Sequence, residues 1–300
     1  MNNIDLHDNS SGENHSYNED NSTREAVTII NCILNAPLML ISILGNALVL
    51  AAIIRTPSIR STPHMIMLCS LAVSDLLVGL IAQPIYIAQQ LTKDRYVNYV
   101  WKIIGPFLCG VSLLTITAIT VDRFLALHYH MRYATLVTES RVKYVLIIIW
   151  LISLLIPFFY FWKISVQICL ISVFIVICLI ISTFSYIRIY RIVRRHQLHI
   201  NAQQQAVESS DAENILNITR LKRTAMNTFV VYIVLIICYF PLYIVSSVSK
   251  DWKIGWKFSS TLVFSNSCIN PFLYCWRLRE LRAAIVKTAK QVFCQQTEVN

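Results

Sequence analysis

Long apolar stretches with almost no charged residues constrain this sequence more than any other feature. A helix needs about 20 mainly apolar residues to cross a bilayer, and it must satisfy its own backbone hydrogen bonds there. Hydrophobic residues make up 56% of the chain and charged ones only 14%, which is too apolar for one soluble core. We therefore predict an all-α membrane protein, a seven-transmembrane helix bundle over residues 27–276. The expected spans are Val27–Ile54, Met65–Gln90, Val97–Val121, Tyr144–Phe161, Ile164–Ile187, Thr224–Val248 and Lys257–Trp276.

The placement of basic residues predicts the orientation of these helices. The formal net charge is +10, but most Lys and Arg residues, such as Arg55, Arg141 and Arg195, fall on the inner side if the N-terminus lies outside. Multi-pass proteins concentrate Lys and Arg in their cytoplasmic loops. We therefore expect a plasma-membrane protein with an extracellular N-terminus, whose basic residues contact membrane lipids and no nucleic acid.

Residues 1–26 form a polar, acidic segment ahead of the first apolar stretch. It carries three glycosylation sequons, at Asn9, Asn14 and Asn21, and a cluster of sequons is typical of a surface segment. We predict an extracellular glycosylated tail. No short apolar run precedes it, so we expect no cleavable signal peptide and insertion directed by the first spanning helix.

Two further segments are expected on the cytoplasmic side. Residues 196–217 are polar and Gln-rich without apolar periodicity, which predicts a flexible third loop. In residues 277–300, Leu278, Leu281 and Ile285 recur at helical spacing among basic residues, which predicts a short amphipathic eighth helix on the membrane surface. Cys294 follows as a candidate for palmitoylation.

Asp75 is the one carboxylate deep within an apolar stretch. A charge inside a membrane is costly and usually functional. Polar residues occur at similar depth in other stretches, and with Asp75 as the metal ligand they predict a pocket for a small cation or a few waters. The alternative is a protonated Asp75 in a structural hydrogen-bond network. The candidate partners are Asn46, Ser112, Asn266, Ser267 and Asn270.

Asp122 and Arg123 follow an uncharged run, Ile103–Val121, and fall at the inner end of their helix. The pair predicts a neutralised contact that restrains one state and is released in another, and the alternative is that Arg123 reaches the membrane surface. Pro241 and Pro271 each remove a helix hydrogen bond, so hinge-like motion is expected beside them.

Taken in order, the motifs resemble those of the rhodopsin-like (class A) G-protein-coupled receptors. One motif falls in most of the expected helices, and the resemblance covers residues 27 to 290. Short outer loops and the sequence around Asn270 look most like the melanocortin, adenosine, cannabinoid and lysophospholipid group. The motifs are Gly45-Asn46, Leu71-Ala-x-x-Asp75, Asp122-Arg123-Phe124, Trp150, Cys238-x-x-Pro241 and Asn270-Pro271-x-x-Tyr274.

The resemblance implies a receptor, not an enzyme, that binds an extracellular ligand and activates heterotrimeric G proteins. It implies that Asp75 and its candidate partners form a pocket for an allosteric sodium ion, which is the one cofactor expected. It also implies that Arg123 contacts the G protein after leaving Asp122. The remaining coupling residues implied by the family are Phe124, Met131, Tyr186, Asn270, Pro271 and Tyr274.

Several positions depart from the family pattern. Tyr239 stands where most members have Trp, Cys178 where they have Pro, and Leu221 where some have an acidic partner for Arg123. Asn98 replaces a disulfide Cys of the third helix. With Leu221 in place, restraint of Arg123 is expected from Asp122 alone, so a receptor that signals without ligand stays an alternative.

The ligand is predicted from what the pocket lacks and contains. Gly105 replaces the Asp of amine receptors, Phe264 the Lys of opsins, and Ser246 the Asn of adenosine receptors. The acidic cluster of melanocortin receptors is also absent. Lys102 then predicts an acidic lipid or small acidic molecule, although a peptide is open and Lys102 alternatively points outward. The expected pocket is Gln83, Tyr86, Trp101, Lys102, Gly105, Cys109, Tyr239, Tyr243 and Phe264.

Two other classes are weighed against a receptor. A transporter needs a polar path, often with internal repeats, and the chain has one deep carboxylate and no repeat. An intramembrane enzyme needs a catalytic pair or metal ligands within reach, and neither a His nor a second deep Asp accompanies Asp75.

Overall fold

The computed structural model describes the backbone of residues 5–57, 62–92, 94–129, 132–206, 212–248, 253–277 and 279–297. Side chains of 5–21, 248 and 253, most of 196–228 and parts of 277–297 lie outside the description. Asn9, Asn14, Asn21, Met131, Leu221 and Cys294 are therefore not described as side chains.

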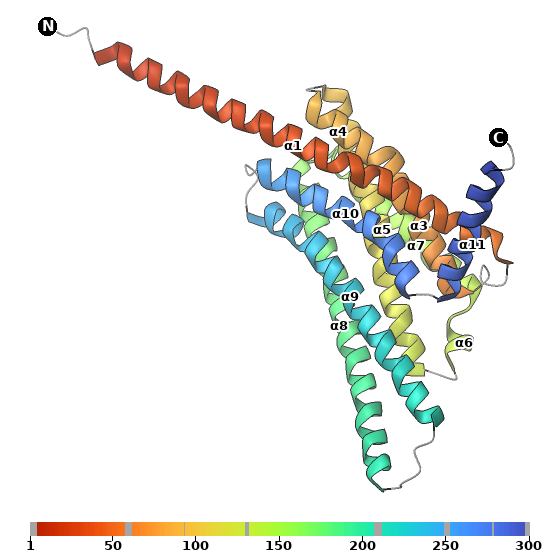
Figure 1. The fold of residues 1–300 in the computed structure, drawn as a ribbon. Coiled ribbons are helices and arrows are strands. Elements are labelled where there is room, and N and C mark those ends of the chain that lie inside the picture. The colour runs from red at the N-terminus through yellow and green to blue at the C-terminus, as the bar shows by residue number, and fades with distance from the viewer. Residues whose placement is uncertain are drawn as a thin grey trace.

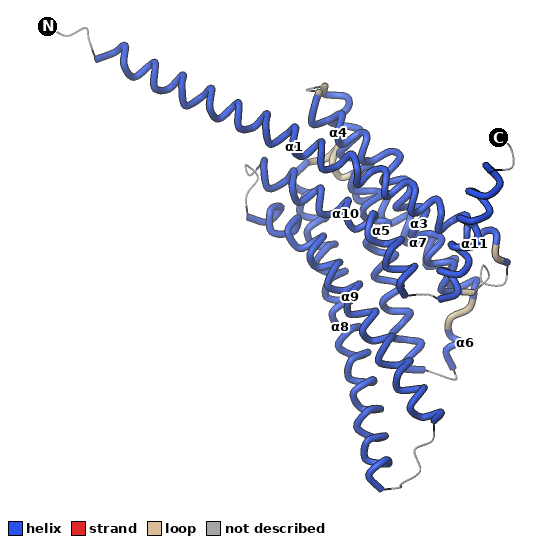
Figure 2. The backbone as a smooth tube through the Cα atoms, viewed as in Figure 1, coloured by secondary structure: helices blue, strands red, loops and turns tan. Residues whose placement is uncertain are grey.

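Helices account for nearly all of the described residues, and no strand occurs among them (Figure 2). The seven predicted spans correspond to α1, α3 with η1 and α4, α5, α7, α8, α9 and α10 (Figure 1). The elements are α1 (Asp5–Arg55), α3 (Pro63–Leu77), η1 (Val78–Ala82), α4 (Gln83–Leu91), α5 (Arg95–Tyr129), α6 (Tyr133–Leu136), α7 (Glu139–Phe158), α8 (Ile164–Ala206), α9 (Ala212–Val248), α10 (Lys253–Arg277) and α11 (Arg279–Thr297).

Six helices in the described part are long and apolar enough to cross a membrane by length and composition. The seventh, α10, packs between α1 and α9 and carries buried polar residues, including Asn266, Ser267 and Asn270. Polar groups are tolerated there because they face the bundle interior. The all-α fold with seven spans is confirmed.

α7 shows how these helices divide between core and surroundings. Its buried residues recur every three or four positions, so they form one stripe, and large exposed residues such as Ile147, Leu151 and Leu155 cover the opposite side. In a membrane that opposite side faces lipid. The buried stripe is Val142, Leu146, Ile149, Ser153 and Pro157.

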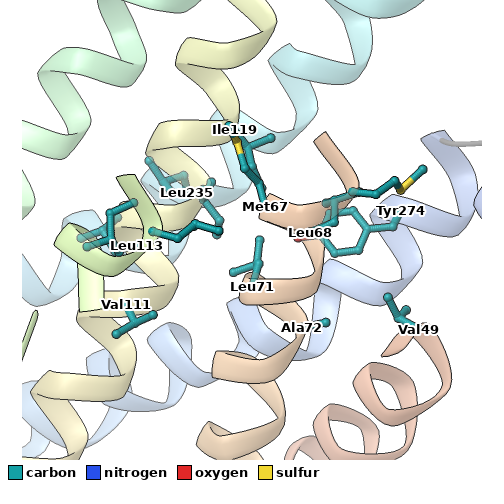
Figure 3. Close-up of a cluster of buried hydrophobic side chains, with 14 of the residues drawn as sticks. Val49, Met67, Leu68, Leu71, Ala72, Val111, Leu113, Ile119, Leu235 and Tyr274 are labelled. Carbon is teal, nitrogen blue, oxygen red and sulfur yellow. The ribbon is translucent and has the colours of Figure 1, made fainter. Parts of the chain in front are cut away.

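The apolar core joins α1, α3, α5, α9 and α10, and Figure 3 shows its central side chains. Leu68 and Tyr274 lie close together there, with Val49 of α1 beyond them (Figure 3). α1 also approaches α10 closely, since a Cβ on Gly45 would lie 2.9 Å from Pro271 Cγ. Only glycine permits that approach.

A turn of π-helix, η1, interrupts the second span between α3 and α4. Pro84 follows it, and a proline inside a helix lacks an N–H and clashes with the carbonyl four residues earlier, here that of Leu80. The wider turn accommodates that proline. Gly79 within it lies against α1, where an added Cβ would be 2.9 Å from Ile43 Cγ1.

Two expected boundaries differ from the structure. α1 begins at Asp5, well before the apolar stretch. The predicted flexible loop over 196–217 is largely helical, because α8 continues to Ala206 and α9 begins at Ala212. Extending an existing helix is far easier than nucleating one, and Ala, Gln and Glu are good helix formers. Polarity alone was therefore a poor sign of a loop.

The predicted amphipathic helix is present as α11, which packs against α1 and α10. Leu281, Ala284 and Ile285 are buried in the same apolar cluster as Val49 and Ile53 of α1. The apolar stripe of α11 therefore joins the bundle core.

Candidate functional site

Asp75 lies fully buried where α3, α5 and α10 meet, and three side chains donate hydrogen bonds to it. Ser112 Oγ and Ser267 Oγ each donate to Asp75 Oδ1 at 2.7 Å. Asn270 Nδ2 donates to Asp75 Oδ2, also at 2.7 Å. These four residues, which we call the Asp75 cluster, join three helices, and both carboxylate oxygens have partners.

Two predicted members of this pocket, Asn46 and Asn266, do not hydrogen-bond to Asp75. Asn46 Nδ2 donates to the carbonyls of Ser42 at 2.8 Å and Ser267 at 3.1 Å, not to Asp75. Asn46 Oδ1 and Asn266 Nδ2 are buried without a hydrogen-bond partner. Buried polar groups normally find a partner, so Asn46 Oδ1 can accept and Asn266 Nδ2 can donate a further hydrogen bond.

The oxygen atoms around Asp75 suit a small hard cation. Ser112 Oγ and Ser267 Oγ each lie 2.7 Å from Asp75 Oδ1, and hard cations prefer carboxylate and other oxygen ligands. Among the described side chains, no group of three or more His, Cys, Asp or Glu residues is placed to hold a metal ion.

Asp122 occupies the C-terminal part of α5, with its side chain 1% exposed. Arg123 Nη2 lies 3.2 Å from Asp122 Oδ2, and the Tyr133 hydroxyl donates to Asp122 Oδ1 at 2.7 Å. His64 Nδ1 is 3.9 Å from Asp122 Oδ2. The expected pair is therefore present, and Tyr133 and His64 complete what we call the Asp122 cluster.

Burial of the Tyr133 phenol, followed by its hydrogen bond to Asp122, raises the pKa of Tyr133 above its usual range. Tyr133 therefore stays a neutral donor at physiological pH. Sequence reasoning missed Tyr133 and His64, because neither lies in an apolar stretch; their signal was a position close in sequence to the ends of the second and third spans.

The remaining predicted coupling residues are spread over several elements. Phe124 stacks on His128, with ring centroids 5.4 Å apart. Tyr186 stacks on Tyr232 of α9 at 5.4 Å, whereas Tyr274 is buried beside Leu68 (Figure 3). Tyr186 and Tyr274 therefore lie in different packing environments.

A cavity of about 290 Å³ lies among α5, α7, α8, α9 and α10, and we call it the bundle cavity. Its walls are almost entirely apolar. Among the described residues that line it, Lys102 carries the one formal charge. Six predicted ligand residues line the cavity: Trp101, Lys102, Gly105, Cys109, Tyr239 and Phe264.

Lys102 has neutral neighbours in the part of the chain that the structure describes. Its Nζ lies 3.5 Å from the Tyr160 hydroxyl and 4.9 Å from the centre of that ring. Its carbonyl accepts a hydrogen bond from Gln167 Nε2 at 2.8 Å. No described carboxylate pairs with the Lys102 ammonium, so its charge is available to a bound anion.

Three of the predicted ligand residues do not line the cavity. Tyr86 packs instead against Trp101 and Phe264, at 5.0 and 5.1 Å between ring centroids, and these three rings form what we call the aromatic cluster. Gln83 is fully buried away from the cavity, and the Tyr243 ring faces Phe240. The aromatic cluster fills the space beside α4.

Gly105 explains how Trp101 reaches this position. A Cβ on Gly105 would lie 2.6 Å from the Trp101 ring, closer than two carbon atoms can approach, so the ring folds over the glycine. The Tyr86 hydroxyl in turn donates to Asn31 Oδ1 at 3.0 Å and to the Lys257 carbonyl at 3.1 Å. The cluster is thereby tied to α1 and α10.

Asn31, Asn35 and Thr261 form a second buried polar network that the sequence analysis missed. Asn31 Nδ2 and Asn35 Nδ2 each donate to Thr261 Oγ1 at 2.8 Å. The signal available in the sequence was the presence of two Asn residues one helical turn apart within an apolar stretch. This network joins α1 to α10 near the aromatic cluster.

Comparison with known proteins places this geometry in context. The family described as "7 transmembrane receptor (rhodopsin family)" matches residues 45–162 and 157–274. Melanocortin receptor 4 of Danio rerio is 27% identical over 277 residues, covering 85% of this chain and 81% of that protein.

Two further relatives carry different names. Histamine H2 receptor of Canis lupus familiaris is 27% identical over 280 residues, covering 82% of this chain and 76% of that protein. Octopamine receptor beta-1R of Drosophila melanogaster is 24% identical over 328 residues, covering 91% and 64%. The names of these relatives thus refer to different ligands.

Proposed function

The chain belongs to the rhodopsin family of seven-transmembrane receptors, and from this premise we propose that it is a plasma-membrane receptor for an acidic amphiphile, with an extracellular N-terminus. Members of this family are receptors, not enzymes. They cross the membrane several times and signal through G proteins.

The charge of the bundle cavity is the observation that carries the ligand proposal. An apolar cavity with Lys102 as its one charged lining residue among those described favours an anionic group on an apolar body, because an unpaired charge in a low-dielectric site attracts its opposite strongly. The same charge repels a protonated amine. Relatives named for histamine and octopamine therefore do not supply the ligand of this chain.

Coupling to the G protein is proposed to run through the Asp122 cluster. In the observed arrangement Asp122 holds Arg123 at 3.2 Å, and we propose that ligand binding shifts a pre-existing equilibrium toward a state in which Arg123 is released to the G protein. Tyr186, Tyr274 and the proline at Pro271 then rearrange. Because the restraint is local, measurable signalling without ligand is expected.

Sodium is proposed as an allosteric ligand of the Asp75 cluster. Asp75, Ser112 and Ser267 would hold the ion, which supplies a positive charge beside the buried carboxylate. Asn270 bonds the second carboxylate oxygen and keeps Asp75 oriented toward the two hydroxyls. Asn46 Oδ1 and Asn266 Nδ2, which lack hydrogen-bond partners, would be free to bind water that accompanies the ion.

The experiment that tests the ligand proposal uses the full chain in lipid nanodiscs with a purified G protein. Nucleotide exchange is measured with oleate, with a lysophosphatidate and with an uncharged monoacylglycerol. We expect response to at least one of the two anions and none to the neutral lipid. The two anionic arms distinguish a carboxylate from a phosphate head group.

Lys102→Gln is the decisive variant, because it removes the charge and keeps much of the chain length. A hydrogen bond to a charged group contributes about 1.5–3 kcal/mol, so the concentration for half-maximal response should rise about 10- to 100-fold. Lys163→Gln is the matched control, since Lys163 is exposed and does not line the cavity. An unchanged response of Lys102→Gln would refute the proposal.

A further inference from the structure

Ser153 of α7 has an unusual environment for a buried hydroxyl. Its side chain belongs to the buried stripe of α7, with the residue 1% exposed, and its Oγ has no hydrogen-bond partner. The residue also lines the bundle cavity. An unpartnered polar atom at the wall of an apolar cavity is a place where a ligand atom can gain a hydrogen bond.

Other hydroxyls of the chain meet their needs within their own helix. Ser and Thr in helices commonly donate to a carbonyl one turn earlier. Ser246 Oγ donates to the Tyr243 carbonyl and Ser260 Oγ to the Trp256 carbonyl, both at 2.8 Å. These two also line the cavity, so Ser153 differs from them in leaving its donor unused.

Gly110 of α5 provides space opposite the Ser153 hydroxyl. A Cβ added at Gly110 would lie 3.5 Å from Ser153 Oγ and 4.0 Å from Phe174 Cε1. Both distances are those of ordinary contact, so any larger side chain would fill the space in front of the hydroxyl. The glycine leaves that part of the cavity open between α5, α7 and α8.

The distance between Lys102 and Ser153 can be estimated along α5. Lys102 and Gly110 are eight residues apart on this helix, which corresponds to about 12 Å at 1.5 Å per residue. Gly110 lies beside Ser153, since a Cβ added at Gly110 would lie 3.5 Å from Ser153 Oγ. The two polar points of the cavity are therefore about 12 Å apart along the helix.

We infer that the ligand of the bundle cavity is an oxygenated acyl chain, with its anionic group at Lys102 and a hydroxyl or carbonyl oxygen at Ser153. An extended chain advances about 1.2 Å per bond, so the oxygen falls about ten bonds from the anionic carbon. This inference rests on the acidic amphiphile proposed above and narrows its chemistry.

Selectivity follows from the apolar surroundings of Ser153. Sites built to hydrogen-bond a ligand hydroxyl discriminate against analogues that lack it. The net contribution of one neutral hydrogen bond corresponds to about a five- to tenfold change in affinity. A chain with its hydroxyl beside the carboxylate has the same composition and should lose this contribution.

Equilibrium binding of radiolabelled 10-hydroxystearate to the full chain in nanodiscs tests the inference, with competition by 2-hydroxystearate and stearate. We expect 10-hydroxystearate to bind about five- to tenfold more tightly than either competitor. Ser153→Ala should remove this preference and leave stearate affinity unchanged. Ser182→Ala is the matched control, because Ser182 is equally buried and unpartnered but lies off the cavity.

Equal affinity of the two hydroxystearate isomers, a preference that survives Ser153→Ala, or no binding of any of the three acids would overturn the inference. Ligand-free nucleotide exchange, measured on the same preparation, reports on the receptor function separately. Position-dependent binding without exchange would contradict the receptor proposal and leave the assignment of Ser153 intact, whereas exchange without position dependence would do the reverse.

Discussion

The Asp75 cluster and the bundle cavity lie in the same helical bundle, yet they treat polar atoms in opposite ways. The two carboxylate oxygens of Asp75 together accept three hydrogen bonds, two at Oδ1 and one at Oδ2. In the cavity, Ser153 has no partner and Lys102 has no described carboxylate beside it. The hydrogen-bonded groups around Asp75 join three helices, whereas the unpartnered groups of the cavity are suited to the polar atoms of an organic ligand.

Loss of Arg123 should have the largest effect on nucleotide exchange, because both regions are proposed to influence signalling through this one coupling residue. Arg123→Ala should abolish nucleotide exchange on the G protein at normal surface expression, measured with and without ligand. Arg55→Ala, which removes an exposed arginine at the end of α1, should leave exchange intact. Retained exchange in Arg123→Ala would separate both regions from the output.

Replacing Asp75 tests whether its cluster is the satisfied region. Asp75→Leu strands three buried donors, and we expect it to lower the free energy of unfolding by about 2–4 kcal/mol, measured as a fall in Tm in detergent. Ser153→Ala removes an atom without a partner and should change it by less than about 0.5 kcal/mol. Comparable losses in the two variants would remove the contrast between the regions.

Asp75→Asn separates charge from shape in the same assay. The amide keeps the size of the side chain but lacks the negative charge, so the Tm of Asp75→Asn should no longer rise when sodium chloride replaces choline chloride. The unsubstituted chain should retain that rise. A sodium effect that persists in Asp75→Asn would place the ion elsewhere.

The smallest expected effect distinguishes two glycines of α5. Gly105→Ala forces the Trp101 ring away, because the new Cβ would lie 2.6 Å from it, and we expect a loss of about 1–3 kcal/mol. Gly110→Ala has room at 3.5 Å and should leave the Tm unchanged or slightly raised, since alanine favours helix. Equal Tm values would show that the aromatic cluster adapts freely.

The Asp75 cluster could be predicted residue by residue because charge inside a membrane is rare and needs partners. Ser112, Ser267 and Asn270 were all anticipated as its neighbours. Asn46 was assigned to the same pocket, but it donates to the Ser267 carbonyl. A side-chain amide can donate to a backbone carbonyl as readily as to a carboxylate. Depth in the membrane predicts which helices meet, not which atoms pair.

The bundle cavity was harder to predict because its shape depends on how aromatic rings fold. Tyr86 and Trp101 were both expected to line it. Trp101 does so, with its ring over Gly105, whereas Tyr86 packs behind Trp101 and does not reach the cavity. Rotamers of that kind have no sequence pattern. Ser153 did have a sequence signal. It is a small polar residue on the buried stripe of α7, where Leu146 and Ile149 are apolar.

The π-helical turn η1 has a consequence for the chemistry of the whole α4 segment. Each residue added to a helix turns everything after it by about 100°, and a π-turn accommodates one more residue than an α-turn. Tyr86 therefore meets Trp101 and Phe264 because of a single additional residue between it and Asp75. One insertion, and no change of side chain, sets the direction in which the second half of this span presents its groups.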